Sequence, residues 1–363
     1  MKILDRYILK ELLGPFLFGI VAFSSIFVGT DVLFRLARFY TQNGVSLGVI
    51  AQLFLLSLPR IIVLTFPMSM LLASLLAFGR LSGNSEIVAM KAGGVNFYRM
   101  VTPVLILAFL VSCATFILNE SIVPASNHLY EVIVRQEIEK EKMPKSQQNV
   151  VIRNMEDNRL KRLFYAYEYN GETKAMDKVS MQEFNQESKV DRIVTAEKAV
   201  WEGNSWYFYQ GVMYYLNPDG KVNYTLAFKR EKLNLPATPE EVLEQQKEPD
   251  EMNVWELKEQ IAVLSDQKAD TNALLVNYHR RYAVPLASFI FTLIGAPLGL
   301  KPQRSGSSIG LGLSIIIIFI YYIIMTVSGA LGEGGALSPA FSAWLPNLLI
   351  GISGFYLLQK GAQ

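Results

Sequence analysis

The chain has 363 residues, 51% of them hydrophobic and 18% charged, and its formal net charge is +2. A mean hydropathy of +0.25 is high for one soluble domain, and the apolar residues are concentrated in blocks. The single cysteine excludes an internal disulfide, and nucleic-acid binding is disfavoured because the basic residues lie at the ends of apolar segments rather than in one patch.

Six apolar segments are long enough to cross a bilayer, because a hydrocarbon core of about 30 Å requires about 20 helical residues. They lie at roughly 12–34, 60–79, 100–119, 283–300, 309–331 and 341–358. The first segment is longer than the apolar core of a secretory signal and has no clear cleavage site, so we expect it to remain as a span. The run from Leu53 to Leu58 is too short to span by itself. The pattern predicts an α-helical integral membrane protein with six transmembrane helices.

The basic residues near the segment ends predict the orientation of the chain. A cytoplasmic N-terminus puts nine of these residues in the cytoplasm and four on the opposite side. The nine are Lys2, Arg6, Lys10, Arg80, Lys91, Arg99, Lys301, Arg304 and Lys360, and the four are Arg35, Arg38, Arg280 and Arg281. We therefore expect both termini in the cytoplasm and the long segment between spans three and four outside it.

The connection between the second and third spans, LAFGRLSGNSEIVAMKAGG, is longer than a chain reversal requires. A side chain of Asn84 or Ser85 is expected to cap a helix of about two turns, with Glu86 at its positive N-terminal end. Gly93 and Gly94 are expected to end this helix.

The same short helix is predicted to carry a small exposed apolar face, because Ile87 and Met90 recur at i and i+3 with Val88 beside them. Such a face is suited to dock into a groove of a partner protein; the alternative is an interfacial helix that rests on lipid headgroups. The chain lacks the GxxxxGK[ST] motif that holds nucleotide phosphates, so a transporter of this kind requires a separate ATPase. We predict contact with that ATPase through Ser85, Glu86, Ile87 and Met90.

An acidic insert, residues 123–270, separates the third and fourth spans. It holds 20 Lys+Arg and 26 Asp+Glu, against 14 and 6 in the rest of the chain. After a charged helical stretch at 126–142, four short stretches are β-branched or aromatic and partly alternating, at 161–169, 191–203, 205–216 and 221–231. Turn sequences NG and NPDG separate some of them. These features predict an antiparallel β domain, a sandwich or a partly open fold, whose aromatic residues pack a core; a groove for acyl chains is the alternative.

A connector rich in Pro and Glu, residues 233–253, follows the predicted strands. Helical spacing then resumes over residues 255–264. A further helix is expected to run from Asn272 without a break into the fourth span, which would link the insert to the membrane part of the protein.

The residues give no sign of an active site. The chain has no G-x-S-x-G or H-E-x-x-H motif, and its two histidines, His128 and His279, are about 150 residues apart. The ionisable residues in the spans are Asp31 and Arg60, near span ends, whereas proton-coupled transport places acids near the midplane. The pattern favours a non-catalytic transporter subunit without a cofactor of its own over a membrane-bound lipid-modifying enzyme.

The sequence resembles the LptF/LptG permease family, which extracts lipopolysaccharide from the bacterial inner membrane. Four stretches carry the resemblance along the chain: LDRYILKELLGPF, FPMSMLLASLLAFGRLSGNSEIVAMKAGGV, AVWEGNSWYFYQGVMYYLNPDG and APLGLKPQRSG. The second is the most specific, because its small-x-S-E-[IL]-x-[AV]-[ML]-[KRQH]-A-x-G pattern directly follows a span.

The resemblance implies a multi-pass permease of the inner membrane with a periplasmic β-jellyroll between spans three and four. The expected parts are spans one to three with a coupling helix near 84–93 (residues 1–122), a jellyroll-like domain with flanking helices (123–270), and spans four to six (271–363). The implied partners are an LptB-like ATPase dimer, which uses ATP and Mg, a second LptF/LptG-type subunit (a paralogue or a copy), LptC- and LptA-like periplasmic proteins, and lipopolysaccharide.

By the same resemblance, Glu86 matches the acid of the coupling helix. Arg35 and Arg38 lie where the family has basic residues near the phosphorylated sugars of the lipid. Asp31 precedes Arg35 by four residues, so that pair can also neutralise itself, and Arg38 can also be an interfacial anchor. The implied mechanism has lipid entering between span one of one subunit and span five of its partner. Two alternatives remain open: a mechanotransmission-type ABC permease, and a membrane scaffold without lipid transport.

Overall fold

The computed structural model of the chain describes residues 3–138, 146–156, 159–171, 173–185, 189–217, 219–233, 238, 247–267, 269–300 and 308–362. Contacts divide the chain into two compact units: a helical unit of Met1–Ile133, Pro249–Ser265 and Asp270–Gln363, and a β unit of Val134–Glu248 and Asp266–Ala269. Most of the predicted connector at 233–253, together with Lys2, Lys301 and Arg304, lies outside the described residues.

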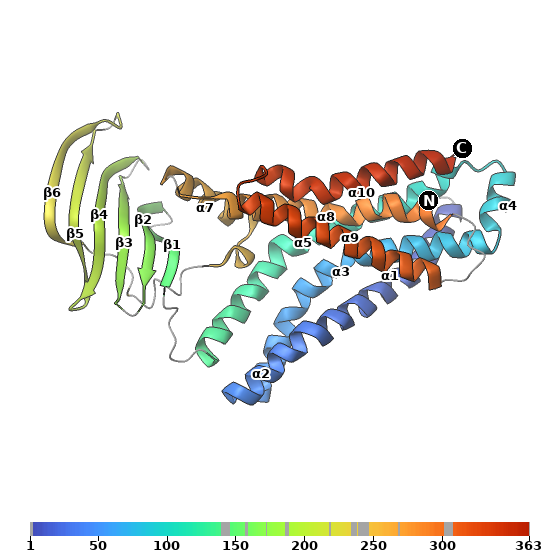
Figure 1. Cartoon of the computed structure of the whole chain (residues 1–363), viewed down its shortest axis with the longest axis horizontal. Helices are drawn as coiled ribbons and strands as arrows, with labels where there is room; N and C mark the ends of the chain where they lie inside the picture. Colours follow the sequence, from blue (N-terminus) through green and yellow to red (C-terminus); the bar gives the residue numbers. More distant parts are fainter. Residues whose placement is uncertain are drawn as a thin grey trace. The chain divides into compact units, whose positions relative to one another are not determined.

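In the described part of the chain, six helices are long and apolar enough to cross a membrane, as predicted. The first runs from Ile3 to Asn43 through α1 (Ile3–Phe27), a π-helical turn η1 (Val28–Val32) and α2 (Leu33–Asn43). The others are α3 (Leu47–Gly83), α5 (Phe97–Glu137), α8 (Asn272–Gly299), α9 (Ser308–Glu333) and α10 (Pro339–Ala362), and Figure 1 shows their arrangement. The chain is therefore a helical membrane protein.

Several of these helices extend beyond the predicted spans. α3 begins at Leu47, where the Ser46 side chain accepts a hydrogen bond from the Val49 amide at 3.4 Å, so the run at 53–58 belongs to the helix of the second span. At 1.5 Å per residue its 37 residues reach about 56 Å, well beyond a bilayer core of about 30 Å. α5 continues into the charged stretch that was predicted to be helical, and α8 starts at Asn272 as predicted.

Two shorter helices complete the helical unit. α4 (Glu86–Ala92) lies between α3 and α5 in the chain. α7 (Val254–Asp266) follows a 3₁₀ turn, η2 (Pro249–Glu251), and confirms the helical spacing predicted over residues 255–264.

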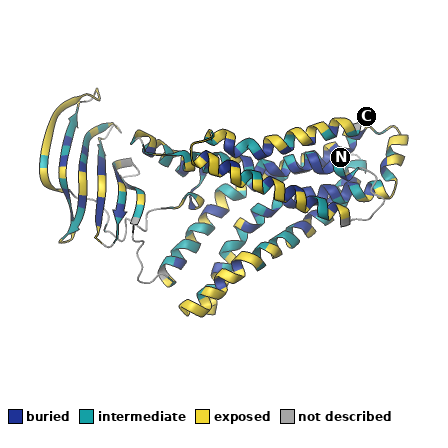
Figure 2. Cartoon of the chain, viewed as in Figure 1, coloured by how far each residue is buried: buried dark blue, intermediate teal, exposed yellow. Residues whose placement is uncertain are grey.

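α3 forms the centre of the helical unit. In its most apolar window 78% of the residues are buried, against 17% for the helix that contains α1. α3 packs closely on α8, since a β-carbon at Gly299 would lie only 2.9 Å from the Leu75 carbonyl oxygen. Figure 2 shows exposed and half-buried residues along much of α1. A single chain therefore leaves much of the surface of α1 uncovered.

The β unit is one antiparallel sheet of six strands in the described residues, which confirms the predicted antiparallel domain. The strands are β1 (Ser146–Glu156), β2 (Arg159–Asn170), β3 (Ala175–Phe184), β4 (Val190–Glu202), β5 (Ser205–Leu216) and β6 (Val222–Leu233). Each pairs with the next in chain order, so the sheet is a meander, whereas a complete jelly roll has Greek-key connections. At most five residues separate consecutive strands along the chain, which accounts for this order.

The prediction located β2, β4, β5 and β6 and missed β1 and β3. The sequence of β1, SQQNVVIRNME, is polar at both ends, and β3, AMDKVSMQEF, has methionines where strands usually carry β-branched or aromatic residues. Both predicted turns are present: Asn170 Oδ1 accepts a hydrogen bond from the Thr173 amide, and Gly220 has φ +76°.

The core of the β unit lies on one face of the sheet. Trp206 and Phe208 of β5 are buried there in a cluster against which Trp201 and Tyr215 pack, so part of the aromatic set packs a core as predicted. On β6, Tyr224 and Leu226 pair with Tyr215 and Met213, which contact this core, and therefore lie on the same face. Both β6 side chains are more than half exposed. The apolar face of the sheet is therefore covered at Trp206 and Phe208 and open at Tyr224 and Leu226, while Leu233 at the end of β6 is buried.

Candidate functional site

α4 has the position and length that the sequence predicted, but a different start. Ser85, which precedes the helix, has φ +60° and makes no side-chain hydrogen bond to the first turn. The Asn84 side chain donates to Glu86 Oε1 at 3.1 Å instead of accepting from a backbone amide. The predicted side-chain cap is therefore wrong. The predicted end is confirmed, because Gly93 follows the last helical residue and Gly94 has φ +78°, which favours glycine.

The Glu86 carboxylate joins α4 to α1. The Tyr7 hydroxyl donates a hydrogen bond to Glu86 Oε2 at 2.6 Å, and Asn84 occupies the other oxygen. The hydrogen bond from Tyr7, and next that from Asn84, lowers the pKa of Glu86 below its ordinary value. Glu86 is therefore an anion at neutral pH. Sequence reasoning missed Tyr7, because no local pattern connects residues that are 79 positions apart.

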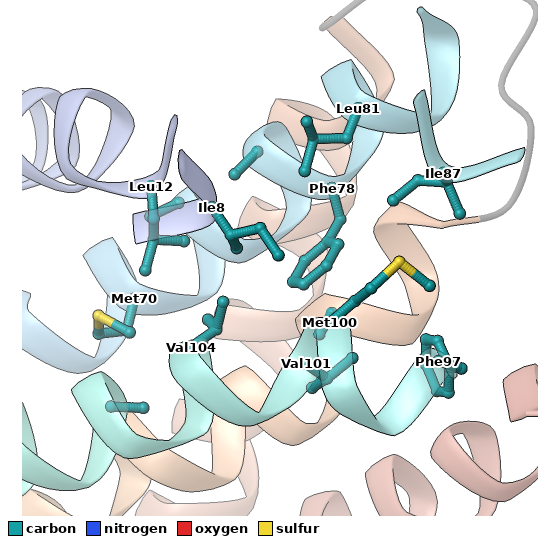
Figure 3. Close-up of a cluster of buried hydrophobic side chains, with 14 of the residues drawn as sticks. Ile8, Leu12, Met70, Phe78, Leu81, Ile87, Phe97, Met100, Val101 and Val104 are labelled. Atoms are coloured by element: carbon teal, nitrogen blue, oxygen red, sulfur yellow. The ribbon is translucent and has the colours of Figure 1, made fainter. Parts of the chain in front are cut away.

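The apolar residues of α4 do not form the exposed face that was predicted. Ile87 is 6% exposed and lies in a cluster with Phe78 of α3 and Phe97 of α5, as Figure 3 shows. Met90 is half-buried against the same cluster. The outward residue is Val88, which is 66% exposed. The i, i+3 spacing thus identifies the side of α4 that packs against other helices of the same chain.

Two ion pairs fix the start of α1 at this end of the helical unit, which we call the α4 end. Arg99 of α5 contacts Asp5 at 2.5 Å, and Arg80 of α3 contacts Glu11 at 3.1 Å. With the bond from Tyr7, the first turns of α1 have charged or polar contacts to α3, α4 and α5. No local spacing in the sequence predicts that these residues meet.

Arg35 and Arg38, the predicted headgroup ligands, both lie on α2. Arg35 contacts both carboxylate oxygens of Asp31 at 3.1 Å, so the self-neutralising pair is present. Arg38 is exposed and forms no ion pair with a described residue. The two therefore differ: Arg35 already has a carboxylate partner, and Arg38 is open to an external anion.

A buried polar cluster that the sequence did not predict lies around Arg281 of α8. The Arg281 side chain donates to the carbonyl oxygens of Asn119 at 3.1 Å, Pro249 at 2.8 Å and Met252 at 2.7 Å, and only 9% of the residue is exposed. Glu120 lies 3.7 Å from the guanidinium and accepts a hydrogen bond from the Val254 amide at 2.6 Å. The cluster thus ties η2 and the start of α7 to α5 and α8.

Two further contacts hold the same segment. His128 of α5 lies 2.8 Å from the buried carboxylate of Glu251, and Arg60 of α3 forms an exposed ion pair with Asp250 at 3.0 Å. His128 and Arg60 therefore have structural partners in the chain. The contacts on η2 come from α3, α5 and α8 together.

The whole chain matches known proteins. The model of the family described as lipopolysaccharide export system permease LptF/LptG matches residues 6–360. The chain is 23% identical to the lipopolysaccharide export system permease protein LptG of Escherichia coli K12, over 99% of this chain and 98% of that protein. It is 21% identical to the protein of the same name from Haemophilus influenzae, over 98% of both chains.

Proposed function

Because the chain belongs to the LptF/LptG family of lipopolysaccharide export system permeases, we propose that it is the transmembrane subunit of an ABC transporter. In this proposal it extracts lipopolysaccharide from the inner membrane and passes it to a periplasmic bridge. A separate LptB-like ATPase dimer uses ATP and Mg, and this chain has no cofactor and no catalytic residue of its own. A second LptF/LptG-type subunit and LptC- and LptA-like proteins complete the system.

The observation that carries the proposal is the arrangement of α4. A helix of two turns, packed by Ile87 on the ends of α3 and α5, leaves Ser85 and Val88 exposed. Its only acid is held in place by Tyr7 and Asn84. A rigid helix with an outward face, in a chain without a nucleotide-binding motif, suits contact with an ATPase. Glu86, Ile87 and Met90 then orient the coupling helix, and Ser85 lies at its accessible start.

The uncovered side of α1 supports pairing with a second permease subunit. A single chain buries 17% of the most apolar window of this helix, so the remaining surface contacts lipid or a partner. The exposed side chains of Tyr224 and Leu226 on β6 support passage of acyl chains through the β unit, because they present apolar surface next to a packed core.

The proposal is tested with the full-length chain purified from bacterial membranes. We expect an ATPase to co-purify, and the complex in proteoliposomes to release lipopolysaccharide to a soluble acceptor only with ATP and Mg. A complex that hydrolyses ATP without releasing lipid would favour a mechanotransmission permease. A chain without any associated ATPase would favour a scaffold.

We expect a cysteine at Asn170, in the turn after β2, to be labelled from outside in intact spheroplasts. The proposed orientation places the β unit in the periplasm and the α4 end in the cytoplasm. The experiment uses Cys113→Ala as background, because Cys113 is exposed. Val88→Cys is the matched control, since its position on α4 should be labelled only after lysis. The opposite labelling pattern would invert the topology.

We expect Arg38→Ala to reduce lipid crosslinking about tenfold and Arg35→Ala to reduce it less. A charge-assisted contact with phosphate contributes roughly 1.5–3 kcal/mol, and the Arg35 charge is partly offset by Asp31. Photocrosslinking to lipopolysaccharide and ATPase activity are measured in the assembled complex. Gln42→Ala, an exposed position on α2, is the control. If the double arginine variant crosslinks and exports lipid like the wild type, the two residues are only interfacial anchors.

A further inference from the structure

The hydrogen bond between Tyr7 and Glu86 is a polar connection between the coupling helix and the first span. Its 2.6 Å length is typical of a hydroxyl that donates to an ionised carboxylate. Among the described residues, the only other hydrogen bond that an α4 side chain makes is the one from Asn84, which caps the end of α3. Tyr7 is 40% exposed, so its ring adds little to the packed core and its hydroxyl is the group that matters.

The carboxylate of Glu86 has both oxygens engaged. Asn84, at the end of α3, holds Oε1, and Tyr7 of α1 holds Oε2. Asn84 caps the end of α3, where its backbone amide donates to the Arg80 carbonyl oxygen, whereas Glu86 is the first residue of α4 and moves when α4 is displaced. The bond to Tyr7 then carries that displacement to α1.

α1 is suited to respond, because little of it is buried within the chain. Ile8 of α1 and Ile87 of α4 also belong to the same buried apolar cluster. Further along the same helix, η1 (Val28–Val32) interrupts the α-helical hydrogen-bond pattern. Such π turns often lie at functional positions, and this one separates the part of the helix near Tyr7 from the part that carries Arg35 and Arg38.

We propose that Tyr7 is a positioning residue that couples movement of α4 to α1 through the Glu86 carboxylate. The inference rests on the proposed function, and it assigns Glu86 a role inside the chain in addition to any contact with the ATPase. ATP binding at the partner displaces α4, and the Tyr7–Glu86 bond moves the span beside which the lipid enters. Without the bond, ATP hydrolysis continues and fewer lipid molecules are released for each ATP.

The test compares Tyr7→Phe with the wild type in the complete complex with its ATPase, reconstituted with lipopolysaccharide in proteoliposomes. The variant removes one hydroxyl and keeps the ring. We expect the ATPase to stay bound and the hydrolysis rate to stay within about twofold, while lipid released per ATP falls about tenfold, as for loss of a charge-assisted bond. Tyr98→Phe is the matched control, because its exposed hydroxyl at the start of α5 makes no hydrogen bond to a described residue.

A second measurement separates coupling from a general loss of structure. If Tyr7 acts through Glu86, adding Tyr7→Phe to Glu86→Ala should change the lipid-to-ATP ratio by no more than about twofold, whereas independent effects would multiply. A Tyr7→Phe complex with the wild-type ratio overturns the inference, as does one that loses the ATPase. A wild-type complex that releases no lipid rejects the proposed function itself, and the inference with it.

Discussion

Glu86→Lys is expected to abolish lipid export while the protein still accumulates, folded, in the membrane. The substitution removes the acceptor of the hydrogen bonds from Tyr7 and Asn84 and places a cation near Arg80, whose charge acts on the native carboxylate. Because both hydrogen bonds to the carboxylate are lost together, we expect a larger loss of coupling than in Tyr7→Phe. Export and ATPase co-purification are the measurements.

The conservative variant Glu86→Gln supplies the control for this experiment. Its amide oxygen still accepts a hydrogen bond from Tyr7, so we expect a smaller loss than in Glu86→Lys. Equal membrane levels of both variants would show that the effect lies in coupling. Wild-type export by Glu86→Lys, with the ATPase still bound, would remove Glu86 from the proposed mechanism.

Arg281→Met is expected to destabilise the helical unit by about 3–5 kcal/mol, which is the range for removing one partner of a buried ion pair. The carbonyl oxygens of Asn119, Pro249 and Met252 would lose their donor, and Glu120 would lose its nearby positive charge. The apolar side chain of methionine replaces the volume but none of these contacts. Thermal unfolding in detergent and the level of protein in the membrane measure the effect.

Arg60→Met is the matched control, because Arg60, like Arg281, contacts η2. Its ion pair with Asp250 is more than half exposed on both sides, so we expect a change of about 0–1 kcal/mol. The loss of stability in Arg281→Lys should lie between those of Arg281→Met and Arg60→Met, since one ammonium group cannot reach all the acceptors that the guanidinium donors reach. Equal stability of Arg281→Met and the wild type would show that the three carbonyl groups find other donors, such as water.

Local sequence patterns were sufficient to predict the six spans and four of the six strands. A span needs a run of apolar residues, and all six runs became helices. The end of α4 depends on Gly93 and Gly94, since Gly94 has φ +78°, a conformation that glycine adopts without strain. Strands with aromatic or β-branched alternation were found, whereas β1 and β3 lack that signal and form because neighbouring strands pair with them.

The prediction that α4 has an exposed apolar face was wrong for a physical reason. The spacing of Ile87 and Met90 indicates an apolar side, but it does not say whether that side meets a partner or the same chain. The ends of α3 and α5 lie against it and bury Ile87. The capping prediction failed similarly, since the Asn84 side chain found the Glu86 carboxylate instead of a backbone amide.

The sequence by itself determined that this is a six-span membrane protein with an inserted antiparallel β domain, because hydropathy and alternation depend on neighbouring residues. Only the tertiary structure decided which polar groups meet. Tyr7 reaches Glu86 across 79 positions, and Arg281 reaches Asn119 across 162. Such contacts arise when packing of apolar helix faces brings distant segments together; the buried guanidinium of Arg281 then needs partners, whereas the bond between Tyr7 and Glu86 is exposed. Packing thus places Tyr7 of α1 beside α4, and Arg281 of α8 beside η2.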